Sequence, residues 1–298
     1  MRDEIRNIAQ KMERRGYVAD RAIATAVHLA QALGKPLLAE GEAGVGKTEI
    51  AKVLAEILGT ELIRLQCYEG LDVHTALYEW NYQRQLLRIR VEESGGTSPE
   101  ELEATIFGRE YLLERPLLRA ITRPEPPVLL IDEIDRADEE FEAFLLELLS
   151  DFQVSVPELG TIEATTRPHV VLTSNSTREL SDALRRRCLY LWIDHPSFEK
   201  ELRILRTHRG RPPMEVDEEI VRFVQRLRAS QLYKTPGVAE TLDWAEALDS
   251  LGVTSLDGEV VRATLGCLLK DRHDIAALAA NGLGEILEDA PTDSSEPS

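Results

Sequence analysis

A glycine-rich run that ends in a lysine and a threonine predicts chemistry more clearly than any other part of this sequence. Its residues are Gly41, Glu42, Ala43, Gly44, Val45, Gly46, Lys47 and Thr48. The glycines let the backbone curl so that several N–H groups point at one anion, and a helix beginning at the threonine adds its partial positive charge. Lys47 would reach the β- and γ-phosphates of a nucleoside triphosphate, and the Thr48 hydroxyl would bind Mg²⁺. A glycine-rich turn without a ligand is the alternative, which the apolar residues before the run and the helical pattern after it disfavour.

Two acidic residues, Asp132 and Glu133, follow the apolar run 128–131 further along the chain. Asp132 would complete the Mg²⁺ shell, and Glu133 would polarise the attacking water. Taken alone, both acids could be solvated residues at the end of a strand. Beside a phosphate-binding loop, a pair of acids predicts a site for ATP and Mg²⁺ and favours hydrolysis by water over transfer to a hydroxyl.

Polar and basic residues nearer the C-terminus could complete such a site. Asn175 ends a buried strand and could orient the attacking water, although an asparagine that only makes a turn is the alternative. Arg185, Arg186 and Arg187 precede the last expected strand. We expect one of them, Arg187 ahead of Arg186, to stabilise transition-state charge across a subunit boundary. A solvated basic helix end is the alternative. A trans-acting arginine would make a ring the active unit.

Composition restricts the partners of the protein. The chain of 298 residues is long enough for one large or two medium domains, and it carries a net charge of −18 and a pI of about 4.9. A nucleic-acid motor needs a basic track, and the three-arginine run is the dense basic cluster in the sequence, so a protein partner is preferred.

The sequence holds neither an apolar stretch of the about 20 residues that span a membrane nor a signal peptide. With three widely spaced cysteines, we expect a cytoplasmic protein with reduced thiols.

The apolar pattern predicts an α/β fold in which strands and helices alternate to form a parallel sheet. We expect five strands, at 35–40, 62–67, 128–132, 169–175 and 189–193, and helices at 3–33, 48–58 and 139–150. The carboxyl ends of parallel strands meet at one edge. The loops that carry Asp132 and Asn175 should therefore lie beside the phosphate loop.

Two segments interrupt this alternation. Residues 69–115 are too long for a plain connection and predict an insert, with a helix expected at 76–91. Residues 152–164 alternate around a Pro/Gly turn and predict a β-hairpin. The stretch 68–90 combines aromatic residues with arginines, which predicts a partner-binding surface; aromatics that fill the core are the alternative.

The predicted domain organisation has three parts. Residues 1–195 form the α/β nucleotide-binding domain, and five helical segments in 196–287 form a smaller lid domain. The acidic, Pro/Ser-rich tail 288–298 is expected to be disordered.

The order of these motifs resembles that of AAA+ ATPases. The insert and the hairpin are similar to the helix-2 insert and the pre-sensor-1 hairpin of the clade that includes MoxR ATPases, magnesium chelatase and the MCM DNA helicases. Residues 132–137 are similar to the MoxR acidic motif, which usually has Asn where this chain has Asp135. Longer strings resemble the CoxD branch, accessory ATPases of molybdenum–copper carbon monoxide dehydrogenase. These strings are 41–52, 65–72, 78–87, 138–152 and 236–244.

The resemblance implies a P-loop AAA+ module with a helical lid, in which Arg187 or Arg186 is the trans finger. The protein would form a ring, a hexamer in this family, and would act with a von Willebrand factor A domain protein. Its client would be a metalloenzyme whose metal centre it helps to mature. One departure concerns the lid, because MoxR lids usually carry a Ser-Pro-Arg motif and this chain reads Thr235-Pro236-Gly237. Lys234 is a candidate substitute for the missing arginine.

Two other functions remain open on the sequence. A DNA motor would share the insert and the hairpin but needs a basic hairpin tip, whereas the turn 157–160 carries an acid. A scaffold that binds ATP without turnover would keep Lys47 but lose Glu133 or the arginine run, and this chain keeps them all.

Overall fold

The computed structural model describes residues 2–92 and 98–278, which form two compact units. The sheet unit holds residues up to 15, 19–41 and 47–193, and the helical unit holds 16–18, 42–46 and the chain from 194 on. Most of the glycine-rich run therefore groups, by its contacts, with the helical unit. The tail 288–298, for which we expect disorder, lies outside the described residues.

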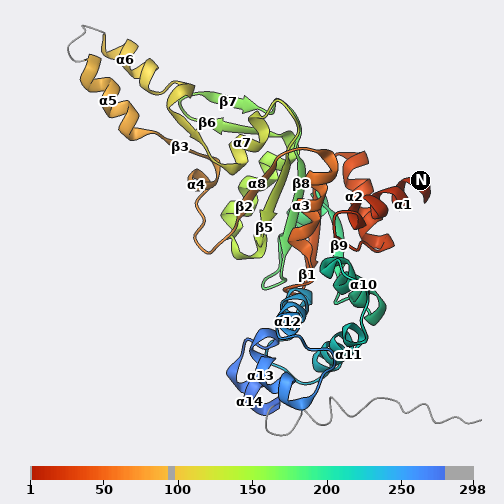
Figure 1. Ribbon diagram of the computed structural model, residues 1–298. Coiled ribbons are helices and arrows are strands. Elements are labelled where there is room, and N and C mark those ends of the chain that lie inside the picture. The colour runs from red at the N-terminus through yellow and green to blue at the C-terminus, as the bar shows by residue number, and fades with distance from the viewer. Residues whose placement is uncertain (1, 93–97, 279–298) are drawn as a thin grey trace, which may run out of the picture. The chain divides into compact units, whose positions relative to one another are not determined.

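A five-stranded parallel sheet forms the centre of the sheet unit (Figure 1), in the order β2-β5-β8-β1-β9. The strands are β1 (Leu37–Gly41), β2 (Leu62–Gln66), β5 (Val128–Asp132), β8 (His169–Ser174) and β9 (Leu189–Ile193). Every residue of β1 and β5 is buried, as expected for inner strands covered on both faces. The predicted α/β class with five parallel strands is confirmed.

Several helices of the sheet unit begin at residues whose side chains cap them. The helices are α1 (Arg2–Glu13), α2 (Arg21–Leu33), α3 (Lys47–Leu58), α7 (Pro116–Thr122), α8 (Glu139–Asp151) and α9 (Asp182–Arg187). The carboxylate of Asp20 accepts a hydrogen bond of 2.9 Å from the backbone N–H of Ile23, so Asp20 caps α2 as expected. The helical region predicted for 3–33 is two helices, because the chain leaves the helical conformation between α1 and this cap.

The predicted insert contains both helices and short strands. Its elements are α4 (Val73–Leu77), β3 (Tyr78–Trp80), α5 (Tyr82–Glu92), α6 (Pro99–Ile106), a 3₁₀ turn (Arg109–Tyr111) and β4 (Leu112–Glu114). The continuous helix expected at 76–91 is wrong, because Tyr78 and Trp80 are buried and their strand pairs with β4 in antiparallel fashion. Trp80 also packs edge-on against Phe107, with ring centroids 5.4 Å apart.

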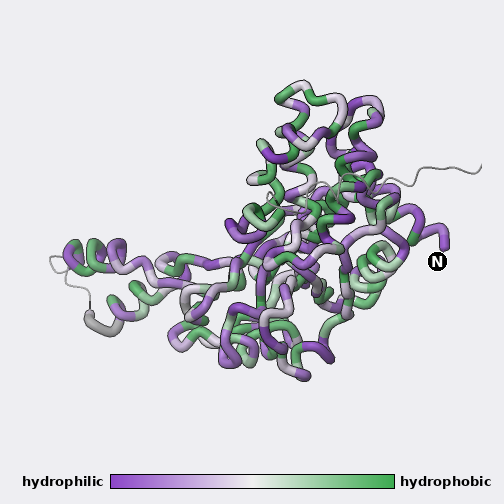
Figure 2. Tube along the Cα trace, turned by 90° about the horizontal axis from the view of Figure 1, so that it is seen from below, coloured by the Kyte–Doolittle hydropathy of each residue, from purple (hydrophilic) through white to green (hydrophobic). Residues whose placement is uncertain are grey.

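Helices α5 and α6 run beside each other and project from the rest of the sheet unit (Figure 1). The Gln85 amide links them by donating to the backbone carbonyl of Ile106 at 2.8 Å. Hydrophobic and hydrophilic residues alternate along this projection (Figure 2), and Leu86, Leu87 and Val91 are exposed. The predicted hairpin is present as β6 (Gln153–Val156) and β7 (Gly160–Glu163), which pair antiparallel.

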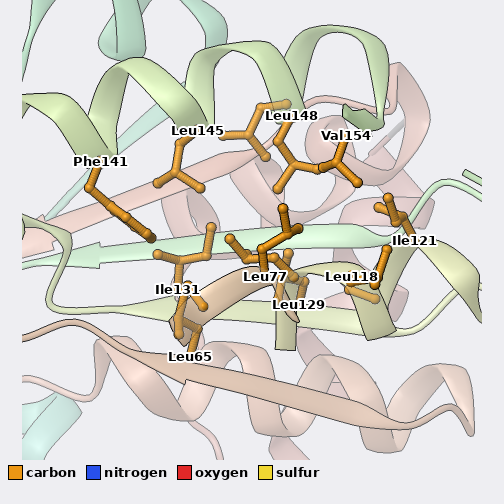
Figure 3. Packing of buried hydrophobic residues seen from close by; sticks show 14 of the residues in the cluster. Leu65, Leu77, Leu118, Ile121, Leu129, Ile131, Phe141, Leu145, Leu148 and Val154 are labelled. Atoms are coloured by element: carbon orange, nitrogen blue, oxygen red, sulfur yellow. The ribbon is translucent and has the colours of Figure 1, made fainter. Parts of the chain in front are cut away.

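One face of the sheet packs on α8 and α7 (Figure 3). The apolar stripe of α8, with Phe141 and Leu145, points at Leu129 and Ile131 of β5, and each of these side chains is almost completely buried. Full burial of such a side chain stabilises a fold by about 1.5–3 kcal/mol. This packing holds β5 in place and thereby fixes the position of Asp132 at its end.

The helical unit has a core of its own. Its helices are α10 (Phe198–Arg209), α11 (Glu215–Ala229), α12 (Val238–Ser250), α13 (Gly258–Leu268) and α14 (Arg272–Ala277). Trp244 is fully buried, packs on Phe223, and donates its ring N–H to the hydroxyl of Thr264 at 2.8 Å. Among the described helices of both units, none has the length and apolar character needed to span a membrane.

Candidate functional site

Asp132 is the centre of a polar cluster at the carboxyl edge of the sheet. Its side chain is buried, with 3% of the residue exposed. One carboxylate oxygen accepts hydrogen bonds from the hydroxyls of Thr48, at 3.0 Å, and Thr173, at 2.6 Å. The other oxygen forms an ion pair of 2.5 Å with the guanidinium of Arg64 on β2. The fold thus joins the threonine after the glycine-rich run to the acid at the end of β5.

This donor set fits Mg²⁺. A hydroxyl and a carboxylate oxygen are hard ligands, and Mg²⁺ in nucleotide sites typically takes few protein ligands and completes its shell with phosphates and water. The described residues hold no group of three or more His, Cys, Asp or Glu side chains that could bind a metal by themselves. A divalent ion at Thr48 and Asp132 would complete its shell with phosphate oxygens or water.

Lys47 and Gly41 flank the middle of the glycine-rich run within the sheet unit. Lys47 is buried, and its ammonium donates to the carbonyl of Gly41 at 2.8 Å. A side chain at Gly41 would place its Cβ 2.2 Å from the carbonyl oxygen of Ile193 on β9, so only glycine fits there. The lysine charge is therefore held at the carboxyl end of β1.

Residues Glu42–Gly46, the middle of the glycine-rich run, belong to the helical unit. Gly44 and Gly46 have φ angles of 77° and 90°, a conformation that favours glycine, while Ala43 is exposed and Val45 is buried. The Glu42 carboxylate lies 2.9 Å from the Nε2 atom of His195.

Glu133, the expected base, has an unusual backbone conformation. Its φ and ψ of 55° and 51° lie in the left-handed region, which costs a non-glycine residue about 1–3 kcal/mol. The N–H of Glu133 donates to the Thr173 hydroxyl at 2.9 Å, so the hydroxyl that holds Asp132 also holds this turn. The Glu133 side chain is 35% exposed and lies 3.7 Å from the guanidinium of Arg136. This geometry leaves the carboxylate in reach of solvent.

Asp135 connects the acidic motif to the loop after β8. Its carboxylate accepts hydrogen bonds from the N–H of Thr177, at 3.0 Å, and from its hydroxyl, at 2.6 Å. Burial acts to raise the pKa of Asp135, but these bonds and one from the backbone N–H of Asn175 outweigh it and lower that pKa. Asn175 is partly exposed and follows directly on β8. The structure therefore places Asn175 in a loop that is tied to the turn containing Glu133.

The three arginines of α9 differ in their surroundings. Arg185 pairs with the buried carboxylate of Glu40 at 3.2 Å. Arg187 donates to the hydroxyl of Ser150 at 2.7 Å and to the carbonyl of Ala183 at 3.1 Å. The side chain of Arg186 is 82% exposed, with Asp182 at 3.8 Å. Of the two arginines expected to act in trans, Arg186 is the one whose guanidinium is held less by its own subunit.

Sequence reasoning missed Arg64, Thr173 and Glu40. Thr173 carried a signal, because a hydroxyl inside a buried apolar strand needs a partner. The partners of Arg64 and Glu40 are brought close by strand register and by the position of a helix. No local sequence pattern encodes either of these. The thiol of Cys67 has its pKa raised to about 12 by burial and by the nearby carboxylates, Asp132 first among them. Cys67 is therefore a protonated structural thiol.

Comparison with known proteins gives the class. Residues 36–188 match the family of the AAA domain (dynein-related subfamily), and the chain belongs to this family. Uncharacterised proteins of Staphylococcus aureus, strains bovine RF122 / ET3-1 and NCTC 8325 / PS 47, are each 24% identical to it over 203 residues, which is 66% of this chain and 69% of theirs.

Two similar solved structures are forms of the RuvB Holliday junction branch migration motor of Thermotoga maritima. The first has 20% identity and a TM-score of 0.46, and it covers 89% of this chain and 71% of that one. A point mutant of the same motor has 19% identity and a TM-score of 0.47, with 87% and 69% covered.

Proposed function

We propose that this AAA+ protein is a Mg²⁺-dependent ATPase that converts ATP and water into ADP and phosphate. The observation that carries the proposal is the hydrogen bond between Thr48 and Asp132, which joins a phosphate-loop hydroxyl to a buried carboxylate at the carboxyl edge of the sheet. That pair, with Lys47 at the end of β1, is the arrangement that a nucleoside triphosphate with its metal requires.

Each residue of the site has a separate role in hydrolysis. Backbone N–H groups of the glycine-rich run and the Lys47 ammonium bind the phosphates, and Thr48 and Asp132 hold Mg²⁺. Bound Mg²⁺ neutralises charge that develops on the phosphate oxygens. Glu133 accepts the proton of the attacking water, and Asn175 orients that water.

An arginine from a neighbouring subunit completes the site. Arg186 or Arg187 supplies it in a ring, for which we propose a hexamer. The nucleotide-binding domain is then 1–195, and 196–287 is the lid.

The work driven by this ATPase is, we propose, remodelling of a protein. Support comes from the net charge of −18, from the acidic hairpin tip at 157–160, and from the strings that resemble MoxR ATPases of the CoxD branch. The client would be a metalloenzyme under maturation, such as molybdenum–copper carbon monoxide dehydrogenase, with a von Willebrand factor A domain protein as partner. The three cysteines, all free, suit the cytoplasm.

Replacement of Glu133 by Gln tests the proposal. Because the amide cannot take a proton, we expect turnover to fall by at least about 100-fold while ATP binding is kept. Phosphate release measures turnover, and Glu140→Gln on the exposed start of α8 is the matched control. Normal hydrolysis by the Glu133 variant would contradict the assignment of the base.

The same assay separates the two other functions. Strong stimulation by duplex DNA would favour a DNA motor over a protein remodeller, and ATP binding without any turnover by the natural protein would favour a scaffold. A pull-down with the Glu133→Gln variant, which should retain ATP and client together, would then identify the client.

A further inference from the structure

The start of α12 touches the glycine-rich run within the helical unit, and two glycines meet at the contact. A Cβ added to Gly237 would lie 2.7 Å from the Cα of Gly44 and 2.9 Å from the carbonyl oxygen of Ala43. A Cβ added to Gly44 would lie 2.9 Å from the Cα of Gly237. Real Cβ atoms essentially never approach below 3.0 Å. No side chain therefore fits at either position without a backbone shift.

A backbone hydrogen bond crosses the same contact. The N–H of Val238, the first residue of α12, donates to the carbonyl of Gly44 at 2.9 Å. The carbonyl of Gly44 and the N–H of Val45 belong to one planar trans peptide group, so they point in opposite directions. The helix therefore sets the direction of the Val45 N–H, one of the groups that a phosphate loop turns towards its anion.

The segment before α12 is itself firmly held. Arg228 donates to the carbonyl of Pro236 at 2.7 Å and pairs through both terminal nitrogens with the buried carboxylate of Glu201, at 2.6 and 2.7 Å. The Glu240 carboxylate accepts from the N–H of Gly237 at 3.0 Å. The contact to Gly44 is thus backed by a buried ion pair that joins α10 to α11.

We propose that Gly237 is a positioning residue through which the helical unit reads the state of the phosphate loop by direct backbone contact, without a charged sensor. This inference rests on the proposed ATPase function. Because the Val238 N–H donates to the Gly44 carbonyl, we expect a change in the peptide planes of residues 43–45 on nucleotide binding to be transmitted to Gly237 and Val238. An arginine at 237 would push the loop away, so the glycine here is required by the contact. Lys234 is exposed, and its backbone N–H is held by Asp274 at 3.1 Å.

Three variants of the full-length chain test this. Gly237→Ala adds one methyl group at a φ of −81°, which alanine tolerates, so its effect is steric. Val238→Pro removes the N–H that binds Gly44 at the first position of a helix, where proline is accepted. Gly266→Ala in α13 is the matched control, because its Cβ meets no atom within 4 Å.

Affinity is measured with a fluorescent ATP analogue and Mg²⁺, and coupling by amide hydrogen exchange at the start of α12 with and without Mg²⁺–ADP. We expect Gly237→Ala and Val238→Pro to weaken binding by at least about tenfold, since small misplacements of a positioned group are costly. The control should stay within about twofold. Nucleotide should slow exchange at 238–241 in the natural protein but not in the Gly237 variant.

Three results would decide against parts of this argument. Folded Gly237→Ala and Val238→Pro proteins with natural affinity and natural nucleotide-dependent exchange would overturn the inference. Tighter binding by Gly237→Arg would also overturn it, because a charged sensor would then suit the site. Failure of the natural protein to bind Mg²⁺–ATP would instead overturn the proposed ATPase.

Discussion

Glu40 and Asp132 are two buried carboxylates at the carboxyl edge of one sheet, yet their surroundings differ. Both residues are nearly inaccessible, with 2% and 3% exposed. Asp132 accepts from two hydroxyls, one of them that of Thr48 on α3, and pairs with an arginine that is half exposed. Glu40 accepts from Arg185 and from the Ser176 hydroxyl, and it also has a side-chain hydrogen bond with Tyr190. Burial alone therefore does not mark a reactive group; the identity of the partners does.

The comparison also explains why adjacent arginines of α9 differ. Because Glu40 holds Arg185 within its own subunit, that guanidinium is not available to a neighbour unless a buried charge is left unpaired, which is costly. The acid near Arg186 is Asp182, which is exposed, so moving Arg186 does not leave a buried charge unpaired. Glu40 on β1 thereby determines which of the three arginines of α9 is available to a neighbouring subunit.

The largest expected effect concerns Arg186. If it acts in trans, Arg186→Ala should lower turnover by about 10³-fold, the low end for a supplied arginine, while nucleotide binding is kept. Mixed rings supply the check: subunits with Arg186→Ala should regain activity when mixed with Lys47→Ala subunits, because some interfaces then combine an intact loop with an intact arginine. Arg185→Ala is unsuitable as a control because it also disturbs Glu40.

Arg187→Ala in the same mixing experiment is the direct rival. A loss of turnover with Arg187→Ala alone, together with rescue in mixed rings, would assign the role to Arg187. It would also mean that the bond to Ser150 is broken on assembly.

A smaller effect compares the guanidiniums that face the two carboxylates. Arg185→Gln removes the cation that pairs with Glu40, and we expect it to lower the free energy of unfolding by about 1–2 kcal/mol, reduced from the fully buried case because Arg185 is partly exposed. Arg64 is more exposed than Arg185, and Asp132 keeps the hydroxyls of Thr48 and Thr173, so Arg64→Gln should cost no more than about 0.5 kcal/mol. Urea denaturation measures both. Equal losses would show that the partners of the two carboxylates do not differ in strength.

Much of the sheet was predictable because its strands are continuous apolar runs bounded by turn residues, and the phosphate loop was predictable because its residues are contiguous. The insert was harder. Tyr78 and Trp80 lie in a stretch with helical spacing, and only the pairing with β4 makes them a strand. Arg64 and Glu40 were missed for the same reason, since their partners are 68 and 145 residues away in the chain.

The smallest expected effect concerns a third buried carboxylate, Asp135, which shares the burial of the other two and accepts hydrogen bonds from the backbone N–H and the hydroxyl of Thr177. Its pKa in the folded protein is lowered, since those bonds outweigh the opposing effect of burial. The stability that it contributes is therefore present above the unfolded pKa of about 3.9 and is lost as pH falls through the lower folded value. We expect Asp135→Asn to unfold with a smaller pH dependence between about pH 4 and 2 than the natural protein. Urea denaturation across that range measures it, and an unchanged slope would mean that Asp135 keeps the same affinity for protons in both states.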